Sequence, residues 1–132
     1  MDLEVRLTGS RMNIDDAFAI SSKRFMSLDE VALLCESTPG EISATLNSLA
    51  VEVAGRYLRG DVSFTAADSL MNNLFDHAAR HAVLPPAFMR VYEAFDQGEY
   101  HHSGDAEGVD SEVVYTKPML LTLIAEGLLP NK

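Results

Sequence analysis

Two histidines four positions apart are the residues best suited to metal chemistry. His77 and His81 fall on a predicted helix, where this spacing places both imidazoles on one face, within reach of one zinc ion. Further ligands would come from a later segment, from among Glu99, His101, His102 and Asp105. The zinc-protease signature has a glutamate base directly after its first histidine, where this chain has Ala78. A small metal-dependent enzyme using His77 and His81 is therefore an alternative, beside the interpretation that both histidines only border an apolar stripe.

No other residue pattern indicates catalysis. The single cysteine, Cys35, follows the apolar run Val31–Leu34, which is typical of a buried thiol and not of a nucleophile. The sequence has neither the local signature of a nucleophile elbow nor a glycine-rich phosphate loop with its lysine. We therefore expect a protein without catalytic residues and without a cofactor.

The strongest local feature is an acidic segment, residues 96–112, which contains six carboxylates and no lysine or arginine. Gly98, Gly104 and Gly108 would let this segment bend and present its side chains to the basic cleft of a partner. The predicted partner-binding residues are Asp96, Glu99, Tyr100, Asp105, Glu107, Asp110 and Glu112. The alternatives are a solvated loop that keeps the protein soluble, or a cation site, although these acids do not keep the register of an EF-hand.

The overall charge points to the same class of partner. The net charge is −10, which repels nucleic acid and anionic membrane surfaces and attracts basic proteins. The most apolar stretch, Met119–Leu129, is too short to span a membrane. The first residues lack the pattern of a secretory signal, and a single cysteine fits a reducing compartment. We expect a cytoplasmic protein that binds neither nucleic acid nor membranes.

The elements that must position these residues are helices. With 132 residues and 47% hydrophobic residues, the chain can form one domain with its own core, spanning residues 1–132. Apolar residues at helical spacing predict helices over about 13–26, 27–36, 38–58, 63–84 and 86–98, and a last helix opened by Thr116. Only residues 3–7 alternate like a strand, which is either an edge strand or an extended arm. The predicted fold is all-α, a compact orthogonal bundle of about six short helices.

Capping patterns locate two of the helix starts. Ser27 and Glu30 have the spacing of a capping box, in which the hydroxyl and the carboxylate each accept a backbone amide. Thr38 and Glu41 repeat the pattern, with Pro39 at the first helical position.

The second and third predicted helices, over residues 28–49, are similar to the helix-turn-helix of bacterial transcription regulators. The expected reading helix, residues 39–53, contains no lysine or arginine, so we treat a DNA-binding regulator as a second alternative.

The second half of the chain resembles the small immunity proteins of contact-dependent inhibition and related polymorphic toxin systems. The residues that carry this resemblance are Gly60–Phe64, Ala67, Asp68, Met71, Asn72, Val91–Tyr100 and Tyr115–Pro118. The resemblance implies a cytoplasmic inhibitor that binds an incoming toxin domain and blocks its active site. A nuclease toxin would suit the acidity of this chain, because a cleft that binds phosphates is basic.

Tight binding of such a toxin would also need buried anchors. The aromatic residues nearest the acidic segment are Tyr92, Phe95, Tyr100 and Tyr115, and of these we expect Tyr100 to be exposed. Tyr92 and Phe95 are equally compatible with the core. The sequence does not determine the oligomeric state or the role of residues 1–58.

Overall fold

The computed structural model of the protein describes residues 11–38 and 40–129, and these form six α-helices, one π-helical turn and no strand. The elements are α2 (Ile14–Ser21), α3 (Leu28–Glu36), α4 (Ile42–Leu58), α5 (Phe64–Arg80), α6 (Pro86–Gln97), the π-helical turn η1 (Glu112–Thr116) and α7 (Lys117–Ala125). The predicted all-α fold is confirmed. The strand or arm predicted for residues 3–7 lies outside the described residues.

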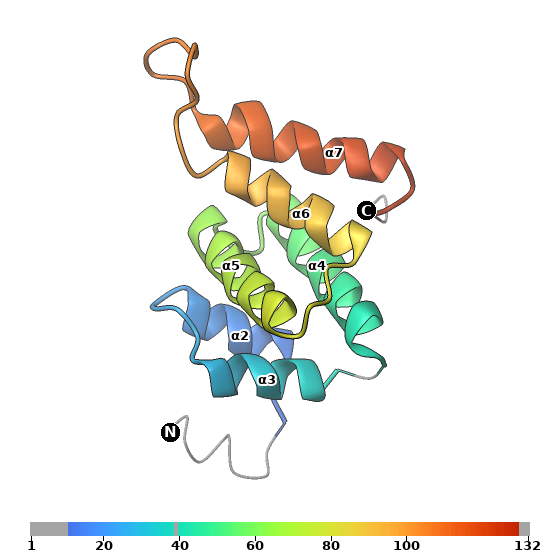
Figure 1. Ribbon diagram of the computed structural model, residues 1–132. Helices are drawn as coiled ribbons and strands as arrows, with labels where there is room; N and C mark the ends of the chain where they lie inside the picture. Colours follow the sequence, from blue (N-terminus) through green and yellow to red (C-terminus); the bar gives the residue numbers. More distant parts are fainter. Residues whose placement is uncertain (1–10, 39, 130–132) are drawn as a thin grey trace.

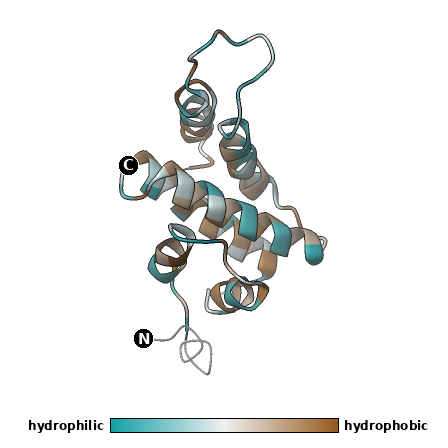
Figure 2. Ribbon diagram, turned by 90° about the vertical axis from the view of Figure 1, so that its left-hand side faces the viewer, coloured by the Kyte–Doolittle hydropathy of each residue, from teal (hydrophilic) through white to brown (hydrophobic). Residues whose placement is uncertain are grey.

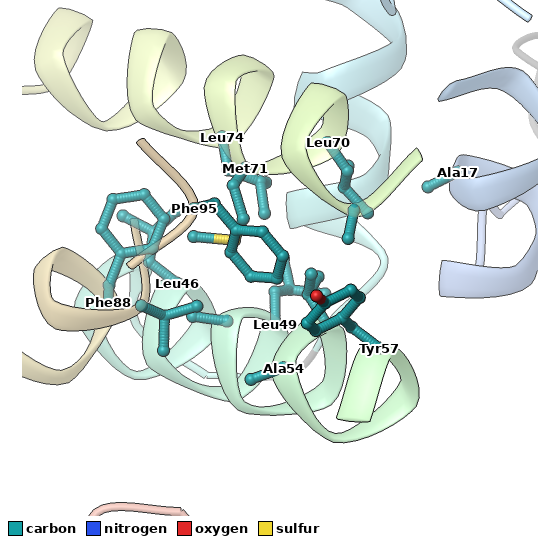
Figure 3. Close-up of a cluster of buried hydrophobic side chains, with 14 of the residues drawn as sticks. Ala17, Leu46, Leu49, Ala54, Tyr57, Leu70, Met71, Leu74, Phe88 and Phe95 are labelled. Atoms are coloured by element: carbon teal, nitrogen blue, oxygen red, sulfur yellow. The ribbon is translucent and has the colours of Figure 1, made fainter. Parts of the chain in front are cut away.

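The helices form three layers. In Figure 1, α4 and α5 lie side by side in the middle, α2 and α3 lie below them, and α6 and α7 lie above them. α6 contacts both middle helices on one side and α7 on the other, so α7 is the outermost helix. The core lies between α4, α5 and α6, where the fully buried Phe88 and Phe95 of α6 pack among leucines of α4 and α5 (Figure 3).

Local hydrogen bonds explain where α2 and α3 begin. The Ser27 hydroxyl accepts the Glu30 amide, and the Glu30 carboxylate accepts the Ser27 amide, so the predicted capping box is confirmed. Asn13 caps α2 in the same way together with Asp16. The buried Glu30 also receives two hydrogen bonds of 2.8 Å from Arg24, and this guanidinium is the main reason why the pKa of Glu30 falls to about 2.

The second predicted capping box is wrong. α4 begins at Ile42, after Glu41, and no side chain caps it. The Thr38 hydroxyl instead donates to the Leu34 carbonyl at 3.0 Å, which closes the end of α3. Pro39, which was predicted to occupy the first position of this helix, lies outside the described residues.

Three predicted helix ends also differ from the structure. α2 ends at Ser21 and not near residue 26. α5 ends at Arg80, because the chain turns at Ala82, whose φ of 54° is left-handed, before Pro85 is reached. The last helix begins at Glu112 with η1 and not at Thr116. No helix in the described part of the chain is long and apolar enough to cross a membrane.

Candidate functional site

The acidic segment forms a projecting loop between α6 and η1. It leaves the bundle beyond the end of α6 and returns at the start of η1, and Figures 1 and 2 both show it standing clear of the helices. Two of its three glycines, Gly104 and Gly108, have φ values of +92° and +83°, which favour glycine. The six carboxylates of residues 96–112 are therefore gathered at one end of the molecule.

A stack of rings gives the loop an internal framework. The ring of His102 lies between two tyrosines, with its centroid 4.2 Å from that of Tyr100 and 3.9 Å from that of Tyr115. The Nε2 atom of His102 lies 2.8 Å from the Gln97 carbonyl, which ties the stack to the end of α6. Tyr100 closes the outer end of the stack and is 49% exposed, as predicted. The loop thus presents an aromatic surface beside its carboxylates.

Hydrogen bonds inside the loop restrain it further. The Tyr115 hydroxyl donates to both oxygens of Asp105, at 2.8 and 2.9 Å, and this bond raises the pKa of Tyr115. The Ser111 hydroxyl donates to the Tyr100 carbonyl at 2.6 Å. The His101 ring contacts the Ala106 carbonyl at 3.0 Å. These bonds join the two sides of the loop and hold Asp105 in place.

The base of the loop is packed against the core. A Cβ atom on Gly98 would lie 2.0 Å from the Thr116 hydroxyl and 3.1 Å from the Phe64 ring, so Gly98 serves close packing and not a turn. Its φ of −82° is open to any residue. The buried Thr116 hydroxyl donates to the Ala94 carbonyl at 2.7 Å, which joins η1 to α6.

The predicted binding residues differ in how far they are available to a partner. Glu107 is exposed and has no hydrogen bond or ion pair with another described residue. Glu99 is exposed and accepts a hydrogen bond of 3.2 Å from Asn72, and Asp110 is exposed and accepts the Glu112 amide at 3.0 Å. All three carboxylates are exposed; Glu107 and Asp110 face outward, and Glu99 also contacts α5 through Asn72.

The other carboxylates face the protein. Asp105 is held by Tyr115, and Glu112 turns inward and accepts the hydroxyl of Tyr57 in a short hydrogen bond. Asp96 is partly buried, which raises its pKa, and neighbouring Glu99 and Glu93 raise it further. The structure therefore brings the seven predicted residues to one end of the molecule but divides them into an outward and an inward set.

One carboxyl group of this site was not predicted. Asp68 on α5 lies against Glu99, and Asn72 one turn later places its amide nitrogen 3.5 Å from Asp68 and 3.2 Å from Glu99. Burial, then the hydrogen bond with Glu99, raises the pKa of Asp68 to about 8. One Asp68 oxygen is buried without a hydrogen-bond partner in the described chain, and the raised pKa keeps Asp68 protonated near neutral pH. The spacing of Asp68 and Asn72 on one helix face was the available signal, but it did not identify Glu99.

The aromatic anchors are also divided by the structure. Phe95 is fully buried in the core, so it cannot serve as an anchor for a partner. Tyr92 is half-buried and stacks on Phe75, with the ring centroids 4.2 Å apart. Tyr100 is the most exposed of the four, and Tyr115 supports it through His102.

The two histidines proposed for a metal site lie at the far end of α5 from the loop base. The ring centroids of His77 and His81 are 4.5 Å apart, and both rings line an open cavity of about 450 Å³ with Cys35. Burial raises the pKa of the Cys35 thiol to about 11, which keeps it protonated. His101 and His102 belong to the acidic loop and do not join this pair. Among the described residues, no group of three histidine, cysteine or carboxylate side chains is arranged to hold a metal ion.

The helix expected to read DNA is the central helix of the bundle. α4 packs against α3, α5 and α6, and seven of its residues from Thr45 to Tyr57 are buried. The guanidinium of Arg56 near its end is held by Glu52 and Asp15. Its remaining surface therefore offers few groups to a phosphate backbone.

Comparisons with protein-family models, curated proteins and solved structures give no match to this chain.

Proposed function

We propose that this protein is a non-enzymatic binding protein whose acidic loop docks into a basic cleft of a protein partner. The observation that carries this proposal is a projecting loop with six carboxylates and no lysine or arginine, which contains ring stacking and internal hydrogen bonds. A preformed loop binds at a smaller entropic cost than a flexible one, because less motion is lost in the complex.

The charges of the loop would act on the rate of encounter. More than half of the net charge of −10 lies in residues 96–112, so the field of the molecule is strongest at the loop. Glu99, Glu107 and Asp110 are exposed and would steer a basic surface toward this end. Tyr100 lies beside them and would supply apolar contact in the complex.

The partner that we propose is a toxin domain, which this protein would neutralise as an antidote. This proposal is supported by the resemblance to immunity proteins of polymorphic toxin systems and by where the residues that carry the resemblance lie. Phe64, Phe95 and Thr116 belong to those segments, and they pack together at the base of the loop. A toxin that acts on nucleic acid would have the basic cleft that the loop requires.

A charge-reversal variant tests the role of the loop. Glu99→Lys combined with Glu107→Lys reverses two exposed carboxylates, and a lysine at position 99 could still pair with Asp68. The partner would be captured on the wild-type protein from the cytosol of the cells that make it, and its association rate measured at low and high salt. We expect the variant to lower the association rate at low salt about tenfold, with a smaller change in the dissociation rate.

A matched control variant has the same total charge as the loop variant, but its two replacements lie at the other end of the molecule. Glu36→Lys combined with Glu41→Lys reverses two exposed carboxylates at the end of α3 and the start of α4. A lysine at the end of α3 interacts favourably with that helix dipole, and a lysine at the start of α4 interacts unfavourably with the other. We therefore expect the two effects on stability to offset each other. Equal association rates for the two variants would remove the loop from the interface. The antidote role fails separately if the captured partner, expressed alone, does not stop growth.

A further inference from the structure

A cavity of about 240 Å³ opens between the end of α2, the turn that follows it and α5. Ser21 of α2 and Asp68 of α5 both line this cavity. Ser21 is 3% exposed, and its hydroxyl has no hydrogen-bond partner among the described residues. One oxygen of Asp68 is also buried without such a partner. Because buried polar groups are normally hydrogen-bonded, these two open groups indicate that a polar group from outside the chain occupies the cavity.

The Asp68 side of the cavity is continuous with the acidic loop. The Asn72 amide contacts the carboxyl groups of both Asp68 and Glu99. Burial, the hydrogen bond with Glu99, and the charges of Glu99 and Asp96 all raise the pKa of Asp68. In Figure 1 the turn after α2 and the acidic loop lie on the same side of the bundle. Three carboxyl groups therefore meet beside the cavity, where a bound cation would relieve their repulsion.

The basic residues at the rim do not make the cavity a site for an anion. Arg24 donates two hydrogen bonds of 2.8 Å to Glu30, so its charge is neutralised within the protein. Lys23 is exposed, and solvent therefore screens its charge. The Ser22 hydroxyl donates to the Ala19 carbonyl at 2.9 Å. The buried atoms that stay open are oxygens of Ser21 and Asp68, and both accept hydrogen bonds from a cation.

A guanidinium group suits the cavity better than an ammonium group. Phe25 lines the cavity and is 66% exposed, so its ring is available to a ligand. A planar guanidinium stacks on an aromatic ring and is less strongly hydrated than an ammonium. Its fork of N–H donors can also reach two acceptors at once. A cavity of about 240 Å³ is larger than one water molecule needs and has room for this group.

We propose that this cavity is the anchoring pocket for an arginine side chain of the partner, whose guanidinium donates to Asp68 and Ser21 and stacks on Phe25. The inference rests on the proposed function, because the acidic loop would bring the basic surface of the partner to this side of the molecule. A buried arginine is a frequent source of binding energy in protein interfaces. The loop would then set the rate of encounter, and the pocket would set the lifetime of the complex.

Methylguanidinium tests the pocket without the partner. It would be titrated into the full chain at pH 8.5, above the pKa of Asp68, at constant ionic strength. We expect saturable NMR shifts of the Asp68 carboxyl carbon and the Ser21 amide in the millimolar range, as is usual for so small a ligand. Methylurea has the same shape without the charge, and inorganic phosphate has the opposite charge, so neither should bind. Binding of methylurea as tight as that of methylguanidinium, binding of phosphate alone, or no binding of methylguanidinium would overturn the proposal.

Single replacements locate the bound cation. Asp68→Asn should weaken methylguanidinium binding about tenfold and Ser21→Ala about threefold, because each removes one acceptor. The Ser21 hydroxyl has no partner in the described chain, so its loss should not unfold the protein. Lys23→Ala should tighten binding about twofold, whereas it would weaken the binding of an anion. Asp76→Asn, at an exposed position of the same helix, is the control and should change nothing. Equal effects of Asp68→Asn and Asp76→Asn, or weaker binding to Lys23→Ala, would overturn the proposal.

Kinetics with the captured partner separate the pocket from the loop. Asp68→Asn and Ser21→Ala should raise the dissociation rate severalfold and leave the association rate nearly unchanged, because they act only at contact. The loop variant Glu99→Lys/Glu107→Lys should instead lower the association rate. Unchanged dissociation rates for both pocket variants would show that the pocket does not anchor the partner, even where methylguanidinium binds. An unchanged association rate for the loop variant would contradict the proposed function and leave the methylguanidinium result standing.

Discussion

Asp68 holds a proton at a pH at which an exposed aspartate is charged. It lies under the acidic loop on α5, where burial and the neighbouring Glu99 both disfavour its carboxylate form. An acid whose pKa is higher in the folded than in the unfolded state binds an extra proton on folding between those two values. The stability that this proton provides is present below about pH 4 and is lost as the pH rises through about 8.

Replacement of Asp68 with asparagine should remove this dependence. The amide is neutral at every pH and can donate to Glu99, so we expect Asp68→Asn to raise the free energy of unfolding at pH 8.5 by about 1–3 kcal/mol and to change it little at pH 4. Urea unfolding at the two pH values measures this. Asp76→Asn, an exposed position on the same helix, is the control. The raised pKa of Asp68 is refuted if Asp68→Asn keeps the pH dependence of the wild type.

The contrast between Glu30 and Asp68 explains which single-residue features the sequence predicts. The capping box of Glu30 connects residues three positions apart, so its geometry follows from the helix start alone. Asp68 and Glu99 belong to different elements, and their contact depends on how α5 and α6 pack. The inward turn of Glu112 toward Tyr57 has the same origin. The number of acidic residues could be counted from the sequence, but the direction in which each carboxylate side chain points could not be predicted.

At the scale of elements, Gly98 decides how closely α6, α5 and η1 approach. Because an added Cβ would meet the hydrogen-bonded Thr116 hydroxyl and the Phe64 ring, we expect Gly98→Ala to lower the free energy of unfolding by about 1–3 kcal/mol. Gly55→Ala is the matched control. Its Cβ meets only the flexible end of Arg59, and alanine in a helix interior should stabilise by about 0.5–1 kcal/mol. Thermal unfolding of both variants measures the difference, and equal shifts would contradict the role given to Gly98.

Periodicity predicted most of the helices but not all of their ends. Most of the residues that α4, α5 and α6 bury lie on their apolar stripes, because a helix turns the apolar face of its sequence toward the core. The last helix was expected to begin at Thr116, since Pro118 is a common early residue in a helix. The structure continues it back to Glu112 through a π-helical turn, for which there is no sequence signal.

At the scale of the whole molecule, the net charge of −10 should make partner association sensitive to salt, because the acidic loop attracts its partner through charge. Raising the salt concentration from about 0.05 to about 0.5 M shortens the screening length severalfold. We expect slower association with the partner at the higher concentration. Stopped-flow measurements compare the two conditions, and an unchanged association rate would contradict steering by the loop.

The π-helical turn η1 couples the direction of the acidic loop to the packing at its base. It contains one residue more than the equivalent α-helical turn, with the Lys117 amide bonded to the Glu112 carbonyl five positions earlier. Deletion of a single codon within residues 112–116 would convert it to regular helix and rotate the chain before it by about 100°. Because Thr116 and Glu112 bond to α6 and α4, such a deletion would turn the acidic loop only by breaking its attachment to the core, while Leu120 and Leu123 keep α7 in its place.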